Sequence, residues 1–375
     1  MLTTPHRPNR DRPPTIDDRI REVMSIHFDP KWGAPYWIAR ARDLDVDPRR
    51  DVRTIADLAR LGLMRPVALR DHPLEHFIPR AVLEEPSRVI VARTGGTLGR
   101  PVWTAYVDDE FHDAFVEPFV AAARHVGFPS GGTWLYVGPA GPHIIARAAD
   151  AIARRTGSMT PLMVDFDTRW ARRLPSGSFS ARRYLAHVVA QATDAIATQN
   201  VTTIFTTPTL LGALADAMTA GQRACIRGVH YGGMAVDTDD LARFQSELFP
   251  EAVHLAGYGN TLFGCCLELA TPPDRTMLRY YPWGARVVFG VLPDEDRDGT
   301  GTDERAPCWV PSREAAGQLV FTRLDRTMLL ANVVERDQVH LITPPDDAPP
   351  GFFATGVASP HPEVGRQPTA DVSLY

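Results

Sequence analysis

The 375-residue sequence has little lysine, little cysteine, no long apolar run and no excess of positive charge. Its 40 basic residues face 45 acidic ones and include a single lysine, Lys31. The net charge of −5 argues against nucleic acid as a partner, because a polyanion is bound by a strongly basic face. No stretch reaches the roughly 18 apolar residues of a membrane-spanning helix, so we expect no membrane partner.

Cysteine is too scarce to build a disulfide framework in a chain of this length. The four cysteines show no CxxC spacing and favour a reducing, cytoplasmic compartment; they are Cys225, Cys265, Cys266 and Cys308. Two adjacent cysteines with a third far away, and no histidine at ligand spacing, make a weak zinc site. The first residues lack the apolar segment of a signal peptide, and we expect residues 1–14 to form a disordered tail.

Hydrophobic periodicity predicts an α/β fold. Residues 15–75 are predicted to be mainly helical, and short β-branched runs then alternate with amphipathic segments. The predicted strands are 88–93, 102–107, 133–137, 159–164, 201–206, 226–231 and 252–256. The predicted helices are 109–126, 142–155, 184–199, 209–220 and 238–248. Such alternation is typical of a mostly parallel sheet covered by helices.

The pattern changes again toward the end of the chain. Residues 15–275 are predicted to form the α/β core, and residues 276–343 a β-rich subdomain with strands near 286–292, 317–323 and 332–335. Residues 344–375 carry two Pro-Pro pairs and little periodicity, so we expect an irregular C-terminal tail.

A glycine-rich segment between two predicted strands is the sharpest local signal. Residues 94–101 read Thr-Gly-Gly-Thr-Leu-Gly-Arg-Pro. Glycines let the backbone approach a ligand closely, and hydroxyls with successive N–H groups suit phosphate oxygens. The segment matches neither a Walker A loop nor a dinucleotide-binding GxGxxG. A hairpin turn and a phosphate loop both fit it, and the side chains of Thr94, Thr97 and Arg100 favour phosphate.

Two further glycine turns follow predicted strands. Residues 231–234 read Tyr-Gly-Gly-Met and residues 258–261 read Tyr-Gly-Asn-Thr. Ligands of α/β sheets bind at the carboxyl ends of strands, so Tyr231 and Tyr258 are candidates to sandwich a flat ring. For either turn taken alone, an ordinary glycine turn is the favoured interpretation. Asp337 follows an apolar run, and a carboxylate there suits the hydroxyls of a ribose.

Together, the order and spacing of these segments resemble the adenylate-forming superfamily, specifically its phenylacetate–CoA ligase-like branch. Residues 94–101 are similar to the phosphate loop Ser/Thr-Ser-Gly-Thr-Thr-Gly-Lys-Pro in six of eight positions, with Arg100 counted for lysine. Residues 231–233 resemble the start of aromatic-Gly-Gly-Glu-Pro, and residues 258–261 that of Tyr-Gly-x-Thr-Glu. Asp337 falls on the aspartate that ends Tyr-Arg-Thr-Gly-Asp. The resemblance covers roughly residues 28–342.

The resemblance implies an AMP-forming ligase with the large N-terminal domain of that superfamily. Such an enzyme uses ATP and Mg²⁺ to convert a small, aryl or apolar carboxylic acid into an acyl-adenylate. The acyl group then passes to CoA, a carrier-protein thiol or an amine. The resemblance implies phosphate contacts for Thr94, Thr97, Arg100 and Thr261. It implies nucleotide contacts for Gly96, Gly99, Tyr231, Gly232, Gly233, Tyr258, Gly259 and Asp337.

Two histidines are candidates for the acid pocket that the resemblance implies. His143 opens a predicted helix, where a capping or solvent-facing role is the alternative. His230 precedes the Tyr-Gly-Gly turn, where an ordinary strand position is the alternative.

The departures from the family pattern affect the metal and the lid. Leu262 stands where the family has a glutamate that helps to hold Mg²⁺, which leaves Glu268 as the candidate metal ligand. Met234-Ala235 replace Glu-Pro, and no arginine precedes Asp337 in the family's place. Only 38 residues follow Asp337, against a family lid of roughly 100 residues with a catalytic lysine. We therefore expect a slow first step or a lid function supplied by another chain.

Two alternatives stay open at this point. A catalytically degenerate nucleotide- or acyl-binding partner protein is favoured by the missing glutamate and lid. Adenylation of a different oxyacid, such as nitrite for N–N bond formation, is the second alternative. A homodimer is the default expectation for the assembly.

Overall fold

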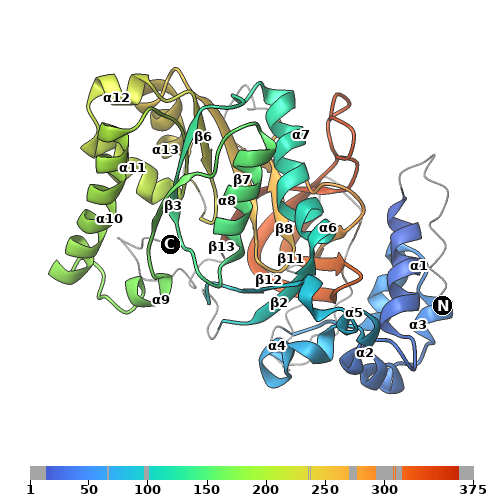
Figure 1. Cartoon of the computed structure of the whole chain (residues 1–375). Coiled ribbons are helices and arrows are strands. Elements are labelled where there is room, and N and C mark those ends of the chain that lie inside the picture. Colours follow the sequence, from blue (N-terminus) through green and yellow to red (C-terminus); the bar gives the residue numbers. More distant parts are fainter. Residues whose placement is uncertain are drawn as a thin grey trace.

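The computed structural model describes residues 14–65, 67–96, 101–234, 236, 238–269, 277–292, 307, 309 and 315–362. These residues form three sheets and the helices around them (Figure 1). The predicted N-terminal tail lies outside the described residues except for Pro14. Within the described ranges, no helix is long and apolar enough to cross a bilayer.

The N-terminal segment is helical, as predicted. Thr15 begins the first helix with a capping box, in which its hydroxyl accepts from the backbone of Asp18 and its own N–H donates to that carboxylate. The helices are α1 (Ile16–His27), α2 (Pro35–Arg40), α3 (Pro48–Asp51), α4 (Ala68–Asp71) and α5 (Arg80–Leu83). Short 3-10 turns connect them: Ala41–Asp43, Ile55–Leu61, Leu74–Phe77 and Pro86–Arg88.

This helical segment packs against the C-terminal antiparallel sheet. His27 Nε2 lies 2.8 Å from the carbonyl oxygen of Asp325, and Trp37 Nε1 donates to that of Leu329 at 3.1 Å. Both rings are buried. The N-terminal helices and the C-terminal sheet are therefore held together through buried contacts, which the order of elements along the sequence does not indicate.

A six-stranded sheet forms the centre of the α/β part. Its strands are β3 (Thr133–Gly138), β4 (Leu162–Asp165), β5 (Val201–Thr206), β6 (Gly228–Tyr231), β7 (Val253–Asn260) and β8 (Gly264–Leu267). The order is β4-β3-β5-β6-β7-β8, with the first five strands parallel and β8 antiparallel to β7. The α/β fold with a mostly parallel sheet is confirmed, although β8 was not predicted.

Helices cover both faces of this sheet (Figure 1). One face carries α7 (Glu117–Val126) and α8 (Ile144–Arg155), and the other carries α10 (Phe179–Thr198), α11 (Pro208–Ala217) and α13 (Thr238–Arg243). Shorter helical pieces are α6 (Asp108–Phe111), α9 (Thr168–Ala171), α12 (Ala220–Ala224) and the π-helical turns His112–Val116 and Phe244–Leu248. Two apolar cores result, one on each face.

A five-stranded antiparallel sheet follows, with the order β10-β11-β12-β13-β9. Its strands are β9 (Arg279–Tyr280), β10 (Val287–Leu292), β11 (Ala316–Leu324), β12 (Leu329–Ile342) and β13 (Gly356–Pro362). The predicted irregular tail is wrong at residues 356–362, because β13 pairs there between β12 and β9. Two prolines within seven residues concealed this strand in the sequence. The domain boundaries themselves stay a prediction.

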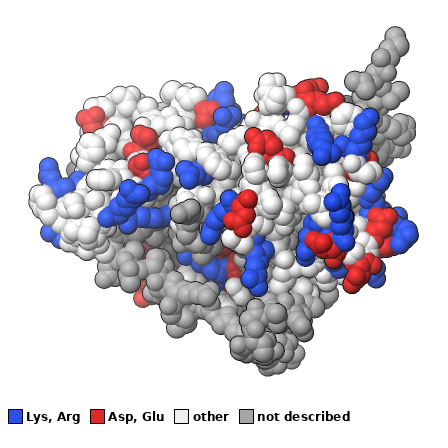
Figure 2. All heavy atoms as spheres, turned by 90° about the horizontal axis from the view of Figure 1, so that it is seen from below, with Lys and Arg blue, Asp and Glu red and all other residues white. Residues whose placement is uncertain are grey.

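A two-stranded hairpin, β1 (Val89–Arg93) and β2 (Trp103–Val107), carries the glycine-rich segment between its strands. Both strands were predicted. On the face shown in Figure 2, basic and acidic side chains are interspersed among uncharged ones.

Candidate functional site

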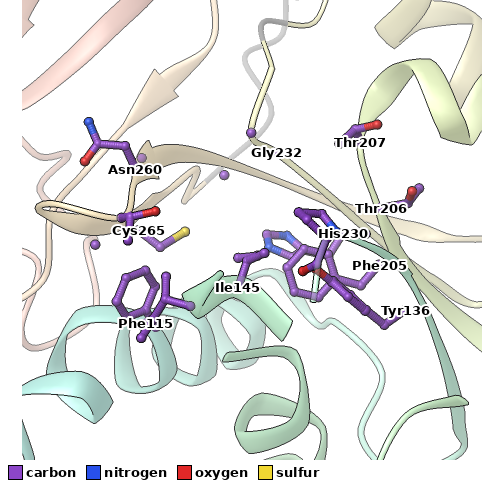
Figure 3. Close-up of a pocket in the computed structure, with 18 of the residues that line it drawn as sticks. Phe115, Tyr136, Ile145, Phe205, Thr206, Thr207, His230, Gly232, Asn260 and Cys265 are labelled. Carbon is purple, nitrogen blue, oxygen red and sulfur yellow. The ribbon is translucent and has the colours of Figure 1, made fainter. Parts of the chain in front are cut away.

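A pocket lies at the carboxyl edge of the parallel sheet (Figure 3). Its cavity volume is about 70 Å³, and the empty space reaches about 620 Å³ when the adjoining open solvent is included. The ends of β3, β5, β6 and β7 contribute to it, which is where α/β sheets bind ligands. Its lining is Phe115, Tyr136, Val137, Gly138, Pro139, Ile144, Ile145, Phe205, Thr206, Thr207, His230, Gly232, Gly233, Gly257, Gly259, Asn260, Thr261, Gly264 and Cys265.

The pocket has a polar side and an apolar side. Strand ends supply hydroxyls, an amide and backbone groups from Thr206, Thr207, Gly232, Gly233, Asn260 and Thr261. Aromatic and aliphatic side chains form the opposite wall; they include Phe115, Tyr136, Ile145 and Phe205 (Figure 3). Among the described residues that line the pocket, none is a lysine, arginine, aspartate or glutamate. The site therefore suits a ligand with a polar end and an uncharged, apolar body.

Glycine is required where the strand-end turns approach one another. A Cβ on Gly232 would lie 2.7 Å from the carbonyl oxygen of Gly257, and one on Gly259 would overlap the carbonyl of Gly264. Both glycines line the pocket, as predicted for a close approach of backbone and ligand.

His230 is held on the pocket face of β6. Its Nδ1 lies 2.8 Å from the carbonyl oxygen of Leu255, and the rings of Phe205 and Phe119 lie 4.3 and 4.9 Å from its own. Burial lowers the pKa of His230 to about 4, so the imidazole is neutral at pH 7. The structure thus places one of the two histidine candidates in the pocket.

The two tyrosines of the glycine turns point away from this pocket. Successive strand residues face opposite sides of a sheet, and Tyr231 follows His230 on β6. Tyr231 is buried in the core on the other face, beside Phe244 and His254. Tyr258 likewise alternates with the pocket-lining Gly257 and Gly259. Among the described pocket residues, the two rings therefore do not form the expected sandwich, although Gly232, Gly233 and Gly259 lie where predicted.

Tyr258 and Asp337 meet beside the pocket. The Tyr258 hydroxyl donates to Asp337 Oδ2 at 2.8 Å. Burial and the carboxylates of Asp337 and Glu335 raise the pKa of Tyr258 well above its usual value, so it stays a donor. Asp337 lies within β12 rather than after a strand. Their expected nucleotide contacts stay a prediction, and the direct contact between the two side chains was not predicted.

The turn after β7 is hydrogen-bonded to β12, the strand that carries Asp337. Asn260 Nδ2 donates to Glu335 Oε1 at 2.7 Å, and Asn260 Oδ1 accepts from the backbone of Leu262. Burial, followed by the charge of Asp337, raises the pKa of Glu335 to about 7. The sequence analysis missed Asn260 and Glu335, although Asn260 stands inside the predicted motif.

Buried polar side chains hold the turn from the other side. Tyr106 donates its hydroxyl proton to the carbonyl oxygen of Thr261 at 2.8 Å. Arg323 Nη1 donates to the carbonyl of Leu262 at 3.1 Å, and Arg286 Nη1 to that of Phe263 at 2.5 Å. Leu262 itself is buried in the core. Thr261 lines the pocket as predicted, and position 262 faces apolar neighbours.

The glycine-rich segment is described only in part. The Thr94 hydroxyl accepts from the backbone of Val102 at 3.0 Å, and Gly96 has a φ of 78°. The carbonyl oxygen of Gly95 accepts from Arg172. Thr94 and Gly96 are not among the lining residues of the pocket. Thr97, Gly99 and Arg100 lie outside the described residues, so their expected phosphate contacts stay a prediction.

His143 is not brought into the pocket. It precedes α8 as the N-cap residue, and its Nε2 lies 3.4 Å from the Thr168 hydroxyl. Burial, together with Arg169 and Arg172, lowers the pKa of His143. The neighbouring Ile144 lines the pocket instead.

Glu268, the candidate metal ligand, does not lie beside Thr261, the candidate phosphate contact. Because β8 runs antiparallel to β7, the chain returns toward the amino ends of the parallel strands, and the backbone of Glu268 donates to Ala256. Glu268 is 3% exposed and borders a second cavity, with His125 and Pro250. The expected metal role of Glu268 is therefore wrong in its geometry. Within the described ranges, no group of three His, Cys, Asp or Glu side chains is placed to hold a metal ion.

No family model and no curated protein matches the sequence. Among solved structures, the chain is similar to three of 2-hydroxyisobutyryl-CoA ligase. The open form with 2-HIB-AMP and CoA gives a TM-score of 0.62 at 15% identity, over 91% of this chain and 72% of that one. The thioesterification state with 2-HIB-AMP and CoA gives a TM-score of 0.60 at 15% identity, over 91% of this chain and 65% of that one. The postadenylation state with 2-HIB-AMP gives a TM-score of 0.60 at 14% identity, over 95% of this chain and 71% of that one.

These likenesses establish the fold. The chain shares its α/β fold with these ligase structures over 91% to 95% of its length, which confirms the fold class expected from the sequence. It spans between 65% and 72% of the length of the ligase chains that it resembles.

Proposed function

We propose that this chain activates a small carboxylic acid with ATP as an acyl-adenylate for transfer to a thiol or amine. The observation that carries the proposal is the division of the pocket into a polar side of strand ends and an apolar wall whose described side chains carry no charge. A nucleotide phosphate at the strand ends would meet the body of the acid on the apolar wall. The structural likeness to a ligase solved with an acyl-AMP and CoA supports the same assignment.

In this reaction a carboxylate oxygen attacks the α-phosphorus of ATP, and pyrophosphate leaves. The chain contributes by positioning the reactants and stabilising the developing charge. Thr207 caps α11, and His143 precedes α8, so two helices of ten and twelve residues begin beside the pocket and direct their positive ends toward it. Thr261, fixed by Tyr106, lies at the same edge. The described residues offer no resident Mg²⁺ site, and we derive no step through a metal ion.

Asp337 is proposed to accept hydrogen bonds from the ribose hydroxyls. We expect Asp337→Ala to weaken ATP and AMP binding at least tenfold, or about 1.4 kcal/mol, because a charge-assisted hydrogen bond is lost. Isothermal calorimetry of the two nucleotides measures this change. Tyr258→Phe is the matched control, since it removes the hydroxyl that contacts Asp337 and keeps the carboxylate. Equal loss in both variants would contradict a direct ribose contact.

Catalysis itself is tested by acid-dependent exchange of labelled pyrophosphate into ATP. The panel comprises aryl acids, short aliphatic acids and nitrite. Exchange with at least one carboxylic acid supports the proposal, and exchange with nitrite alone favours the alternative oxyacid. Nucleotide binding without any exchange favours a nucleotide- or acyl-binding partner protein. That second candidate is supported by Leu262, which is buried in the core where the resembling family has a carboxylate.

A further inference from the structure

We propose that the acid bound in this pocket carries a hydroxyl or uncharged N–H donor on its apolar body, and that His230 Nε2 accepts this hydrogen bond. The inference rests on the proposed function and deepens it by naming the class of acid. It makes His230 a residue that determines specificity.

The hydrogen bond at Nδ1 fixes the tautomer of His230. A carbonyl oxygen only accepts, so the 2.8 Å contact with Leu255 requires the proton on Nδ1. The imidazole is 3% exposed, and its pKa of about 4 keeps it neutral at physiological pH. Nε2 is then a bare acceptor with an available lone pair. Among the described residues, no hydrogen bond to Nε2 is formed.

The Nε2 edge of the ring is the part that borders the pocket. Phe205 and Phe119 pack against the imidazole at 4.3 and 4.9 Å between ring centroids. A Cβ on the lining residue Gly257 would lie 3.0 Å from His230 Cε1 and 3.7 Å from Nε2. A side chain at position 257 would therefore cover this edge, and glycine leaves it uncovered.

The other polar side chains near His230 are already engaged or poorly suited. The Tyr136 hydroxyl donates to the carbonyl oxygen of Pro139 at 2.9 Å, and the Thr206 hydroxyl donates to that of Val137 at 2.8 Å. Burial raises the pKa of the Cys265 thiol to about 12, so the thiol stays neutral and a weak partner. Both hydroxyl protons are thus in use, and among the described side chains of this wall His230 Nε2 is a nitrogen acceptor without a hydrogen-bond donor.

The lining also limits the charge of the acid. Because no described lining residue is ionised, a second carboxylate or an ammonium group against this wall would lose its hydration without gaining a counter-charge from it. Dicarboxylic and amino acids are therefore disfavoured. An acid that lacks a donor would fit the apolar wall but would leave the buried Nε2 without a hydrogen bond. Its binding affinity would be lower for that reason.

The test measures both binding and exchange with matched acids. Benzoic and phenylacetic acids are compared with their ring-hydroxylated and ring-aminated derivatives, by calorimetry in the presence of AMP and by pyrophosphate exchange. In the wild type we expect the best donor-bearing acid to bind at least tenfold more tightly than its parent. In His230→Phe, which keeps a flat ring and removes the acceptor, the two should bind within about threefold.

A matched control and a pH series separate recognition from structure. Phe205→Leu changes the shape of the same wall without changing its polarity, so it should alter parent and derivative by similar factors. If His230 had only a structural role, His230→Phe would lower the affinity for the parent acid and for its derivative by similar factors. The wild-type preference should be constant from pH 6 to 9, because His230 titrates near pH 4.

The outcomes distinguish the two proposals. Selective binding without exchange would support the assignment of the acid and contradict adenylation. Exchange without preference for a donor, or a preference that survives in His230→Phe, would overturn the role of His230 and leave adenylation standing. Failure of every acid of the panel to bind would also overturn the inference.

Discussion

Replacing Asp325 with alanine is expected to lower the free energy of unfolding by about 3–5 kcal/mol. The Asp325 carboxylate is fully buried, and it accepts from Arg286 Nη2 at 2.5 Å and from Arg323 Nε. Burial alone raises the pKa of Asp325, but the two guanidinium groups offset this and hold it below its usual range. The variant leaves two buried cations without their shared counter-charge.

Urea unfolding followed by circular dichroism at pH 7 measures this loss. Asp109→Ala is the matched control, because Asp109 pairs with Arg326 at the surface with 61% of its side chain exposed. Surface pairs of this kind contribute about 1 kcal/mol or less. If the alanine variant does not fold, Asp325→Asn replaces it in the measurement. Asparagine keeps the shape and part of the hydrogen bonding, so its loss of unfolding free energy should be smaller and measurable. Equal losses in Asp325→Ala and Asp109→Ala would contradict the expectation.

The same buried ion cluster that stabilises the fold also holds a turn beside the pocket. Arg286 and Arg323 each use another nitrogen to hold the carbonyl oxygens of the 262–263 turn, next to pocket residue Thr261. Loss of Asp325 frees both guanidinium groups to move, so a folded variant should also bind nucleotide less well. Arginines inside predicted strands look like surface residues in the sequence, and their convergence depends on three separate elements. This cluster was therefore beyond sequence reasoning.

The fold itself was predictable because its elements obey simple periodicities. Alternating apolar runs and amphipathic segments from residue 88 to 256 indicated parallel strands and covering helices, and the sheet has them. The missed strands have weak local signals. β8 is a four-residue stretch that begins with glycine, and β13 contains two prolines. Both are defined by pairing with distant strands, which no local pattern reports.

The pocket was predicted in position but not in the orientation of its side chains. Glycine turns at the ends of β6 and β7 do line it. In a strand buried on both faces, however, both faces carry buried side chains, so their order does not show which residues point to which side. The sequence therefore did not show that His230 rather than Tyr231 lines the pocket. Glu268 failed for a topological reason, since the reversal of β8 moves it away from Thr261.

The pH dependence of stability should report the buried carboxyl of Glu268. Burial raises its pKa from 4.5 to about 8, and its Oε1 atom has no hydrogen-bond partner among the described residues. Between these values the folded protein binds a proton that the unfolded chain releases. The stabilising contribution is therefore complete below about pH 4.5 and is lost as the pH rises through 8. At about 1.4 kcal/mol per pKa unit, the loss is on the order of 5 kcal/mol by pH 9.

Glu268→Gln keeps the shape of the side chain but cannot ionise. We expect it to match the wild type near pH 5 and to be the more stable protein at pH 9, in urea unfolding at both values. Glu335 also has a raised pKa and contributes a slope of the same sign, so the informative quantity is the difference between wild type and variant at each pH. The exposed Glu251→Gln should leave that difference near zero. A Glu268→Gln difference that does not change between pH 5 and 9 would mean that the carboxyl is already ionised in the folded protein, because only an uncharged, buried Glu268 links proton release to unfolding.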